Sequence, residues 1–206
     1  MILKILGNNG PYPAAGGACS GYLLSSDSGN TRILIDCGTG VLNRLMGECL
    51  PKDLDAVVLS HLHYDHMSDM LPMQYALQFG PRPTPLPVYA PEEPEAVRAL
   101  LNVPCYDLWP AEDFTVGEMR VCFTPARHPV PTCAVAVTCD GERFVYTGDS
   151  NQDPGVELLC EGASLLLADC GLSNADHRFV APHYSAGLCG QLATEQLSTH
   201  TYSMLK

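Results

Sequence analysis

The sequence predicts an α/β protein in which two mixed β-sheets pack face to face and helices cover their outer faces. Three observations favour this fold class. Short apolar or alternating runs typical of strands recur along the chain, stretches with helical spacing lie between them, and each half carries a hairpin signal. Layering two sheets in this way buries an apolar face of every sheet and an apolar stripe of every helix.

The first third of the chain reads as short strands broken by turns. Strands are expected at residues 1–6, 19–25 and 32–37, and a Gly/Pro-rich loop at 7–18 separates the first two. Apolar residues at helical spacing predict a helix at 40–50, and a buried strand is expected at 53–60. Strand and helix therefore alternate in this part of the chain.

The remainder continues the alternation and adds a hairpin. A helix is expected at 67–79, interrupted near Pro72, and Asp-Gly between two strands signals a hairpin turn. The other expected elements are strands at 86–90, 118–126, 133–138, 143–148 and 164–170 and helices at 91–101 and 185–197.

Length, charge and cysteine content limit the function. A chain of 206 residues fits one domain, residues 1–206, and its net charge of −12 disfavours long nucleic acids as partners. We find no apolar run long enough for a membrane span and no secretion signal, so we expect a cytoplasmic protein that does not bind membranes. The ten scattered cysteines, without a C-x-x-C pair, are interpreted as free thiols.

The stretch SHLHYDHMSD, residues 60–69, carries the strongest chemical signal. His61 and His63 are two residues apart after a buried strand, so their side chains point the same way and can converge on one ion. His66 has the other parity, so the chain must turn near Asp65, which would let Asp65 and His66 address a second ion. Such a cluster is costly unless a cation neutralises it, and the sequence therefore predicts a metal site.

At this motif the chain resembles the metallo-β-lactamase-fold superfamily, whose signature is H-x-H-x-D-H after a strand. The resemblance extends to RILIDCG with Asp36, TPARHPVP with His128, VYTGDS with Asp149 and LSTHTY with His200. The Gly-rich stretch at 7–24 and APHYSAGLCGQLA with His183 look like the ribonuclease Z-like branch, which includes small phosphodiesterases. The resemblance covers nearly the whole chain and implies an αββα sandwich with a two-metal site at one edge.

Carried over by position, the resemblance implies a complete set of metal ligands. Asp36 would orient the metal-binding loop, and Asp65 and His183 are the candidate catalytic residues, His183 as general acid. The implied ligands are His61, His63 and His128 for the first ion, Asp65, His66 and His200 for the second, and Asp149 as the bridge.

The ligand set is consistent with hydrolysis. Imidazole and carboxylate suit two divalent ions, with zinc preferred and manganese or iron as alternatives. Two cations about 3.5–4 Å apart can share a water, and the bridging hydroxide would then attack a phosphate or a carbonyl. The preferred function is a metal-dependent phosphodiesterase acting on a small anionic substrate, and a homodimer is left open.

Two departures from the family pattern accompany this hypothesis. Only 16 residues separate His183 from His200, fewer than we expect in relatives. No basic, Gly/Pro-rich excursion resembles the arm with which ribonuclease Z grips transfer RNA, which disfavours transfer-RNA processing. Three alternatives stay open: a thioester or lactone hydrolase, an iron-dependent redox enzyme, and a non-catalytic metal-binding module.

Overall fold

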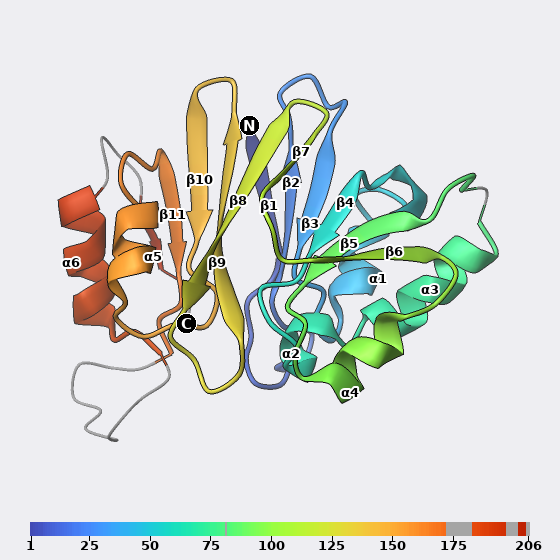
Figure 1. Ribbon diagram of the computed structural model, residues 1–206, viewed down its shortest axis with the longest axis horizontal. Helices are drawn as coiled ribbons and strands as arrows, with labels where there is room; N and C mark the ends of the chain where they lie inside the picture. Colours follow the sequence, from blue (N-terminus) through green and yellow to red (C-terminus); the bar gives the residue numbers. More distant parts are fainter. Residues whose placement is uncertain (81, 172–182, 197–201, 205–206) are drawn as a thin grey trace. The chain divides into compact units, whose positions relative to one another are not determined.

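The computed structural model describes residues 1–80, 82–171, 183–196 and 202–204. The chain forms two compact units. Unit 1 comprises residues 1–112 and 116–118, and unit 2 comprises residues 113–115 and 119–206. Each unit is built on a six-stranded mixed sheet (Figure 1).

The sheet of unit 1 follows the order of its strands in the sequence, β1-β2-β3-β4-β5-β6. The first three strands are antiparallel, and the pairs from β3 to β6 are parallel. Its strands are β1 (Ile2–Gly7), β2 (Gly21–Ser25), β3 (Arg32–Ile35), β4 (Ala56–Val58), β5 (Leu86–Ala90) and β6 (Tyr106–Pro110). Because β3, β4 and β5 are parallel, their carboxyl ends lie at one edge of the sheet.

The helices of unit 1 pack on its sheet and close an apolar core. The core joins Leu34 and Val57 of the sheet to Leu45, Met73 and Leu77 of the helices, all at most 4% exposed. Figure 1 shows α1, α3 and α4 on the same side of the sheet. The helices are α1 (Val41–Leu45), α2 (Tyr64–Met67), α3 (Met70–Gln78) and α4 (Glu95–Arg98), with single 3-10 turns η1 (Pro51–Asp53) and η2 (Ala99–Leu101).

The sheet of unit 2 runs in the order β12-β11-β10-β9-β8-β7. Strands β8, β9 and β10 are antiparallel neighbours, whereas β10, β11 and β12 are parallel. Its strands are β7 (Phe114–Val116), β8 (Met119–Ala126), β9 (Thr132–Cys139), β10 (Glu142–Tyr146), β11 (Leu165–Ala168) and β12 (Tyr202–Met204). Helices α5 (Pro154–Leu159) and α6 (Ala186–Gln196) cover this sheet (Figure 1), and a core that includes Val145, Val156, Leu166 and Leu192 joins them to it.

Most predicted elements are present, and their bounds agree to within a few residues for most strands, whereas the helices are shorter than predicted. The hairpin turn between β9 and β10 is confirmed, and both Asp140 (φ 51°) and Gly141 (φ 78°) have the positive φ that a two-residue turn of this type needs. The predicted interruption near Pro72 is wrong. Pro72 lies in the first turn of α3, where backbone N–H groups have no acceptor within the helix, so the N–H that proline lacks costs no hydrogen bond. The sequence analysis did not predict β6, β7, β12 or α5.

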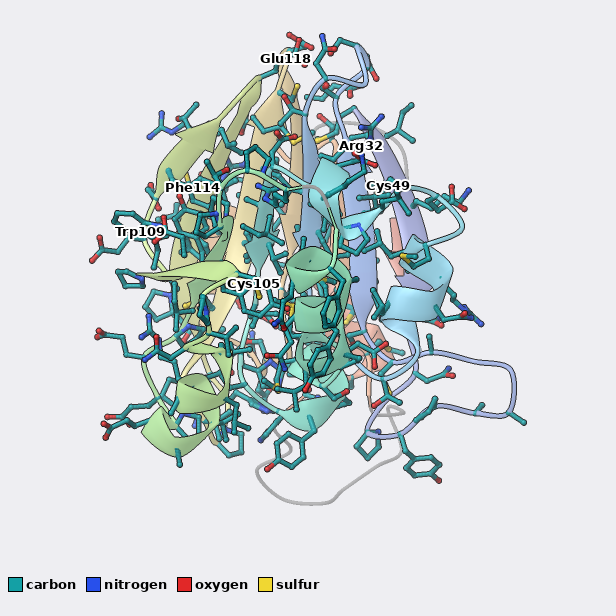
Figure 2. The ribbon with its side chains drawn as sticks, turned by 90° about the vertical axis from the view of Figure 1, so that its right-hand side faces the viewer. Arg32, Cys49, Cys105, Trp109, Phe114 and Glu118 are labelled. Atoms are coloured by element: carbon teal, nitrogen blue, oxygen red, sulfur yellow. The ribbon has the colours of Figure 1, made fainter. Side chains whose placement is uncertain are left out.

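All ten cysteines are free thiols, as predicted, and each is buried or half-buried. Cys49 and Cys105, marked in Figure 2, are half-buried and pack against the core of unit 1. Burial raises the pKa of both thiols above the ordinary value, which keeps them protonated at neutral pH. Among the residues that the structure describes, no helix has the length and apolarity needed to cross a membrane.

Candidate metal centre

The H-x-H-x-D-H segment begins where β4 ends, at the carboxyl edge of the unit 1 sheet. Leu59 and Leu62 are 0% and 2% exposed and belong to the core, so they anchor the segment on both sides of His61. The chain then turns, as predicted, because α2 begins at Tyr64 directly after His63. A rigid strand end therefore presents the histidines.

Three imidazoles of this segment lie in contact. The Nε2 atom of His61 is 3.0 Å from Nδ1 of His63, and their ring centroids are 4.7 Å apart. The ring centroid of His66 lies 4.0 Å from that of His61. His61 is 0% and His66 1% exposed and His63 is half-buried, so the structure brings together the histidines that the spacing predicts.

Asp36 ties this cluster to β3. It follows the last residue of β3, is fully buried, and takes the left-handed conformation (φ 56°) that aspartate tolerates better than most residues. Its Oδ1 accepts a hydrogen bond from the backbone N–H of Ser60 at 2.8 Å. Its Oδ2 accepts from the Ser60 hydroxyl at 2.8 Å and from Nδ1 of His66 at 2.7 Å. These hydrogen bonds connect Asp36 to Ser60 and His66, and its role in orienting the metal-binding loop stays a prediction.

Asp65 sits at the start of α2, beside His66. Its Oδ2 is 3.6 Å from Nε2 of His66, so these two candidate ligands of the second ion are neighbours. The backbone carbonyl of Asp65 accepts from Ser20 N–H at 3.2 Å, and that of His66 accepts from Cys37 N–H at 2.7 Å. Gly38 is required here, because a Cβ atom at this position would overlap the Asp65 carbonyl.

In unit 2, candidate residues follow the ends of two neighbouring parallel strands. Asp149 comes after β10 and Asp169 after β11, and parallel strands bring their carboxyl ends to one edge. His183, just before α6, completes this group. Asp149, Asp169 and His183 each place a potential ligand atom within 4.8 Å of those of the other two.

His183 and Asp169 form the shortest of these contacts. His183 Nδ1 donates to Asp169 Oδ2 at 2.5 Å and is 3.9 Å from Asp149 Oδ2. Burial raises the pKa of the Asp169 carboxyl above its ordinary value, as does the negative charge of Asp149, whereas the hydrogen bond from His183 opposes the rise. The side chain of His183 is 28% exposed, so the ring is held on its Nδ1 side but is accessible to solvent.

His128 lies in the loop after β8, next to Asp149. A ligand atom of His128 comes within 4.8 Å of one of Asp149, and the His128 ring centroid is 5.5 Å from that of His183. The loops are tied together because Asn151 N–H donates to the backbone carbonyl of Arg127 at 3.0 Å. The structure therefore groups His128 with Asp149 within unit 2, two residues that the family resemblance implies as ligands.

The donor sets fit divalent cations. Unit 1 gathers imidazole nitrogens and a carboxylate that are buried or half-buried, and facing nitrogens such as His61 Nε2 and His63 Nδ1 suit a shared cation. The remaining predicted ligand, His200, lies outside the described residues. Sequence reasoning missed Ser60 and Asp169. Asp169 carried a usable signal, since it ends a buried strand as Asp36 and Asp149 do.

Comparisons with known proteins agree with this picture. The family model described as "Beta-lactamase superfamily domain" matches residues 31–200. The chain is 32% identical over 203 residues to the Bacillus subtilis protein "Probable metallo-hydrolase YhfI", covering 95% of this chain and 82% of that protein. It is 31% identical over 193 residues to the ribonuclease Z of Mycolicibacterium paratuberculosis, covering 80% of this chain and 68% of the relative.

Solved structures show the same fold. The crystal structure of the metallo-beta-lactamase fold protein YhfI from Bacillus subtilis matches with a TM-score of 0.85 and 29% identity, over 97% of this chain and 87% of that one. A human short-form tRNase Z structure matches with a TM-score of 0.78 at 16% identity, over 100% of this chain and 98% of the other.

Proposed function

The chain belongs to the β-lactamase superfamily and has the metallo-β-lactamase fold predicted from its sequence, and from this premise we propose that it is a dinuclear metal-dependent phosphodiesterase. The proposed substrate is a small phosphodiester.

The proposed ligands are those carried over from the family motifs. They are His61, His63 and His128 for one cation, Asp65, His66 and His200 for the other, and Asp149 between them. Zinc is proposed first, because buried imidazole and carboxylate donors suit it, and manganese or iron would fit the same donors. Two bound divalent cations would bring the pKa of a water near neutrality and neutralise the phosphate charge.

The chain's own residues would then manage the protons. Asp65 can accept a hydrogen bond from the attacking water in addition to its role as a ligand. His183 can donate a proton from Nε2 to the leaving oxygen, because its Nδ1 is engaged by Asp169. A carboxylate held against Nδ1 stabilises the imidazolium that must be present before the donation.

The observation that carries this proposal is the 2.5 Å contact between His183 and Asp169, beside Asp149. An alkoxide is a poor leaving group and benefits from such a donor, whereas a thiolate, whose conjugate acid has a pKa of about 8.5, leaves more readily without one. The pair therefore favours an ester of an alcohol over a thioester. It also favours hydrolysis over a purely metal-binding role, which would need no proton donor.

Two features favour a small substrate. With a net charge of −12, the chain has few positively charged side chains that could bind a polyanionic partner. The turn between β9 and β10 is too short to be an RNA-binding arm. We therefore propose a small anionic substrate, a cytoplasmic location and no role for long nucleic acids. A homodimer is compatible with this proposal.

The test is hydrolysis by protein loaded separately with zinc, manganese and iron. Bis-p-nitrophenyl phosphate reports phosphodiesterase activity, and a thioester and a lactone in parallel assays report the carbonyl alternatives. We expect turnover of the phosphodiester to exceed that of both carbonyl substrates. Absence of phosphodiester turnover with all three metals, from protein that has bound them, would overturn the proposal.

A further inference from the structure

The buried carboxylate of Asp36 fixes the direction of every hydrogen bond that it makes. An ionised carboxylate only accepts, so each of its partners must donate. Three of its partners are the backbone N–H of Ser60, the Ser60 hydroxyl and Nδ1 of His66, at 2.8, 2.8 and 2.7 Å. His66 must therefore carry a proton on Nδ1. Its other ring nitrogen, Nε2, lies 3.6 Å from Oδ2 of Asp65.

The Ser60 hydroxyl has one proton, and Asp36 takes it. The Ser60 Oγ is also 3.1 Å from Nδ1 of His61. Since the hydroxyl has nothing left to donate, His61 must be the donor in this contact. If the Ser60 hydroxyl instead donated to His61, Ser60 Oγ and Asp36 Oδ2 would lie 2.8 Å apart with no proton between them. Both residues are fully buried, so this arrangement is strongly unfavourable.

His63 differs from the other two histidines. In the neutral ring, His61 with a proton on Nδ1 has an unprotonated Nε2, which lies 3.0 Å from Nδ1 of His63. In the metal-free protein, His63 Nδ1 must then donate to His61 Nε2. A cation held by both of these atoms would need that proton to leave His63 Nδ1.

We propose that Ser60 is a positioning residue: by donating its hydroxyl proton to Asp36, it requires His61 to carry its proton on Nδ1. His61 and His66 then already have the tautomer that leaves Nε2 to bind a cation. Only His63 changes its tautomer when the cation binds. This inference rests on the proposed metal site but not on the substrate or the reaction. A serine hydroxyl thus lets one carboxylate orient two histidines.

The test begins with ¹⁵N NMR of the histidine side chains in the metal-free wild-type protein. We expect His61 and His66 as Nδ1–H tautomers and His63 with its proton on Nδ1. Zinc titration should then remove the Nδ1 proton of His63 and leave those of His61 and His66 in place. A metal-free His61 with its proton on Nε2 would overturn the proposal, whatever the protein hydrolyses.

Variants separate positioning from general stability. Ser60→Ala should lose the Nδ1–H preference of His61 and bind zinc about 10–100-fold more weakly in chelator competition. Ser60→Thr keeps the hydroxyl and should restore both. The matched control is Ser26→Ala, which also deletes a buried serine hydroxyl of unit 1. The Ser26 hydroxyl is hydrogen-bonded to Ser28 and to the backbone N–H of Thr31, and not to a histidine.

Ser26→Ala should leave the His61 tautomer and the zinc affinity unchanged. Equal losses of zinc affinity in Ser60→Ala and Ser26→Ala would mean that Ser60 acts only through stability and would overturn the proposal. The expected tautomers without any hydrolysis would contradict the proposed function alone, and turnover with the opposite tautomers would contradict this inference alone.

Discussion

The candidate residues of the two units differ in burial and in the elements that carry them. In unit 1, the side chains of Asp36 and His66 are 0% and 2% exposed, and every candidate except Asp36 comes from one short segment. In unit 2, the side chains of His183 and Asp169 are 28% and 13% exposed, and the candidates come from separate strand ends. The buried pair Asp36–His66 is therefore suited to holding a side chain in place, whereas the pair His183–Asp169 keeps the solvent access that proton transfer needs.

The largest expected effect tests this difference in burial. Asp36→Ala leaves two buried donors of Ser60 and one of His66 without their acceptor, so we expect the free energy of unfolding to fall by about 3–5 kcal/mol. Asp169→Ala should cost less than about 1 kcal/mol, because water can reach His183. Urea denaturation of metal-free protein measures both, and equal losses would contradict the contrast.

The second prediction concerns proton transfer. His183→Gln should lower turnover of an alkyl phosphodiester by about 10²–10⁴-fold, because its alkoxide leaving group needs a proton. Bis-p-nitrophenyl phosphate should be much less affected, since p-nitrophenolate leaves without one. Steady-state rates on both substrates give the result, and metal content by elemental analysis should equal that of the wild type. A similar loss on both substrates would argue against a general acid.

The third prediction separates a proposed metal ligand, His61, from the proposed proton donor, His183, by zinc binding. Zinc at 100 times its Kd should stabilise the wild-type protein by about 2.7 kcal/mol, and removal by a chelator should reverse the gain. His61→Ala should lose most of this stabilisation, and His183→Gln should keep it. Thermal unfolding with and without zinc provides the measurement. The assignment of roles fails if the two variants respond alike.

The smallest expected effect comes from a matched pair of glycines. Gly38→Ala forces a Cβ into the backbone of Asp65, so we expect a cost of about 1–3 kcal/mol and weaker zinc binding. Gly171→Ala brings a Cβ to 3.1 Å from the His183 ring, which a half-exposed side chain can accommodate at about 0.5 kcal/mol. Denaturation and zinc titration would show whether the unit 1 cluster is the less tolerant one.

Some structural features could be read from the sequence and others could not. Strands and the hairpin turn were predictable because their periodicity and their Asp-Gly signal are local. Helix α5 also had local signals that went unused, since Asp153 caps it by accepting from Gly155 N–H at 2.8 Å and Pro154 occupies its first turn. Strand β6 was missed because apolar and polar residues alternate only weakly along it. Trp109, for example, is a large apolar residue at an exposed position, with 49% of its surface accessible to solvent.

The sequence alone indicated a cation-binding segment at residues 60–69 and most of the strands, because ligand spacing and hydrophobic periodicity act over a few residues. Only the tertiary structure decided which carboxylate meets which histidine. Asp36 reaches His66 across 30 positions, and Asp169 reaches His183 across 14. Those contacts depend on strand order and on the end of each strand, so they exist only once the sheets have formed. The proton positions on the histidines follow from these contacts.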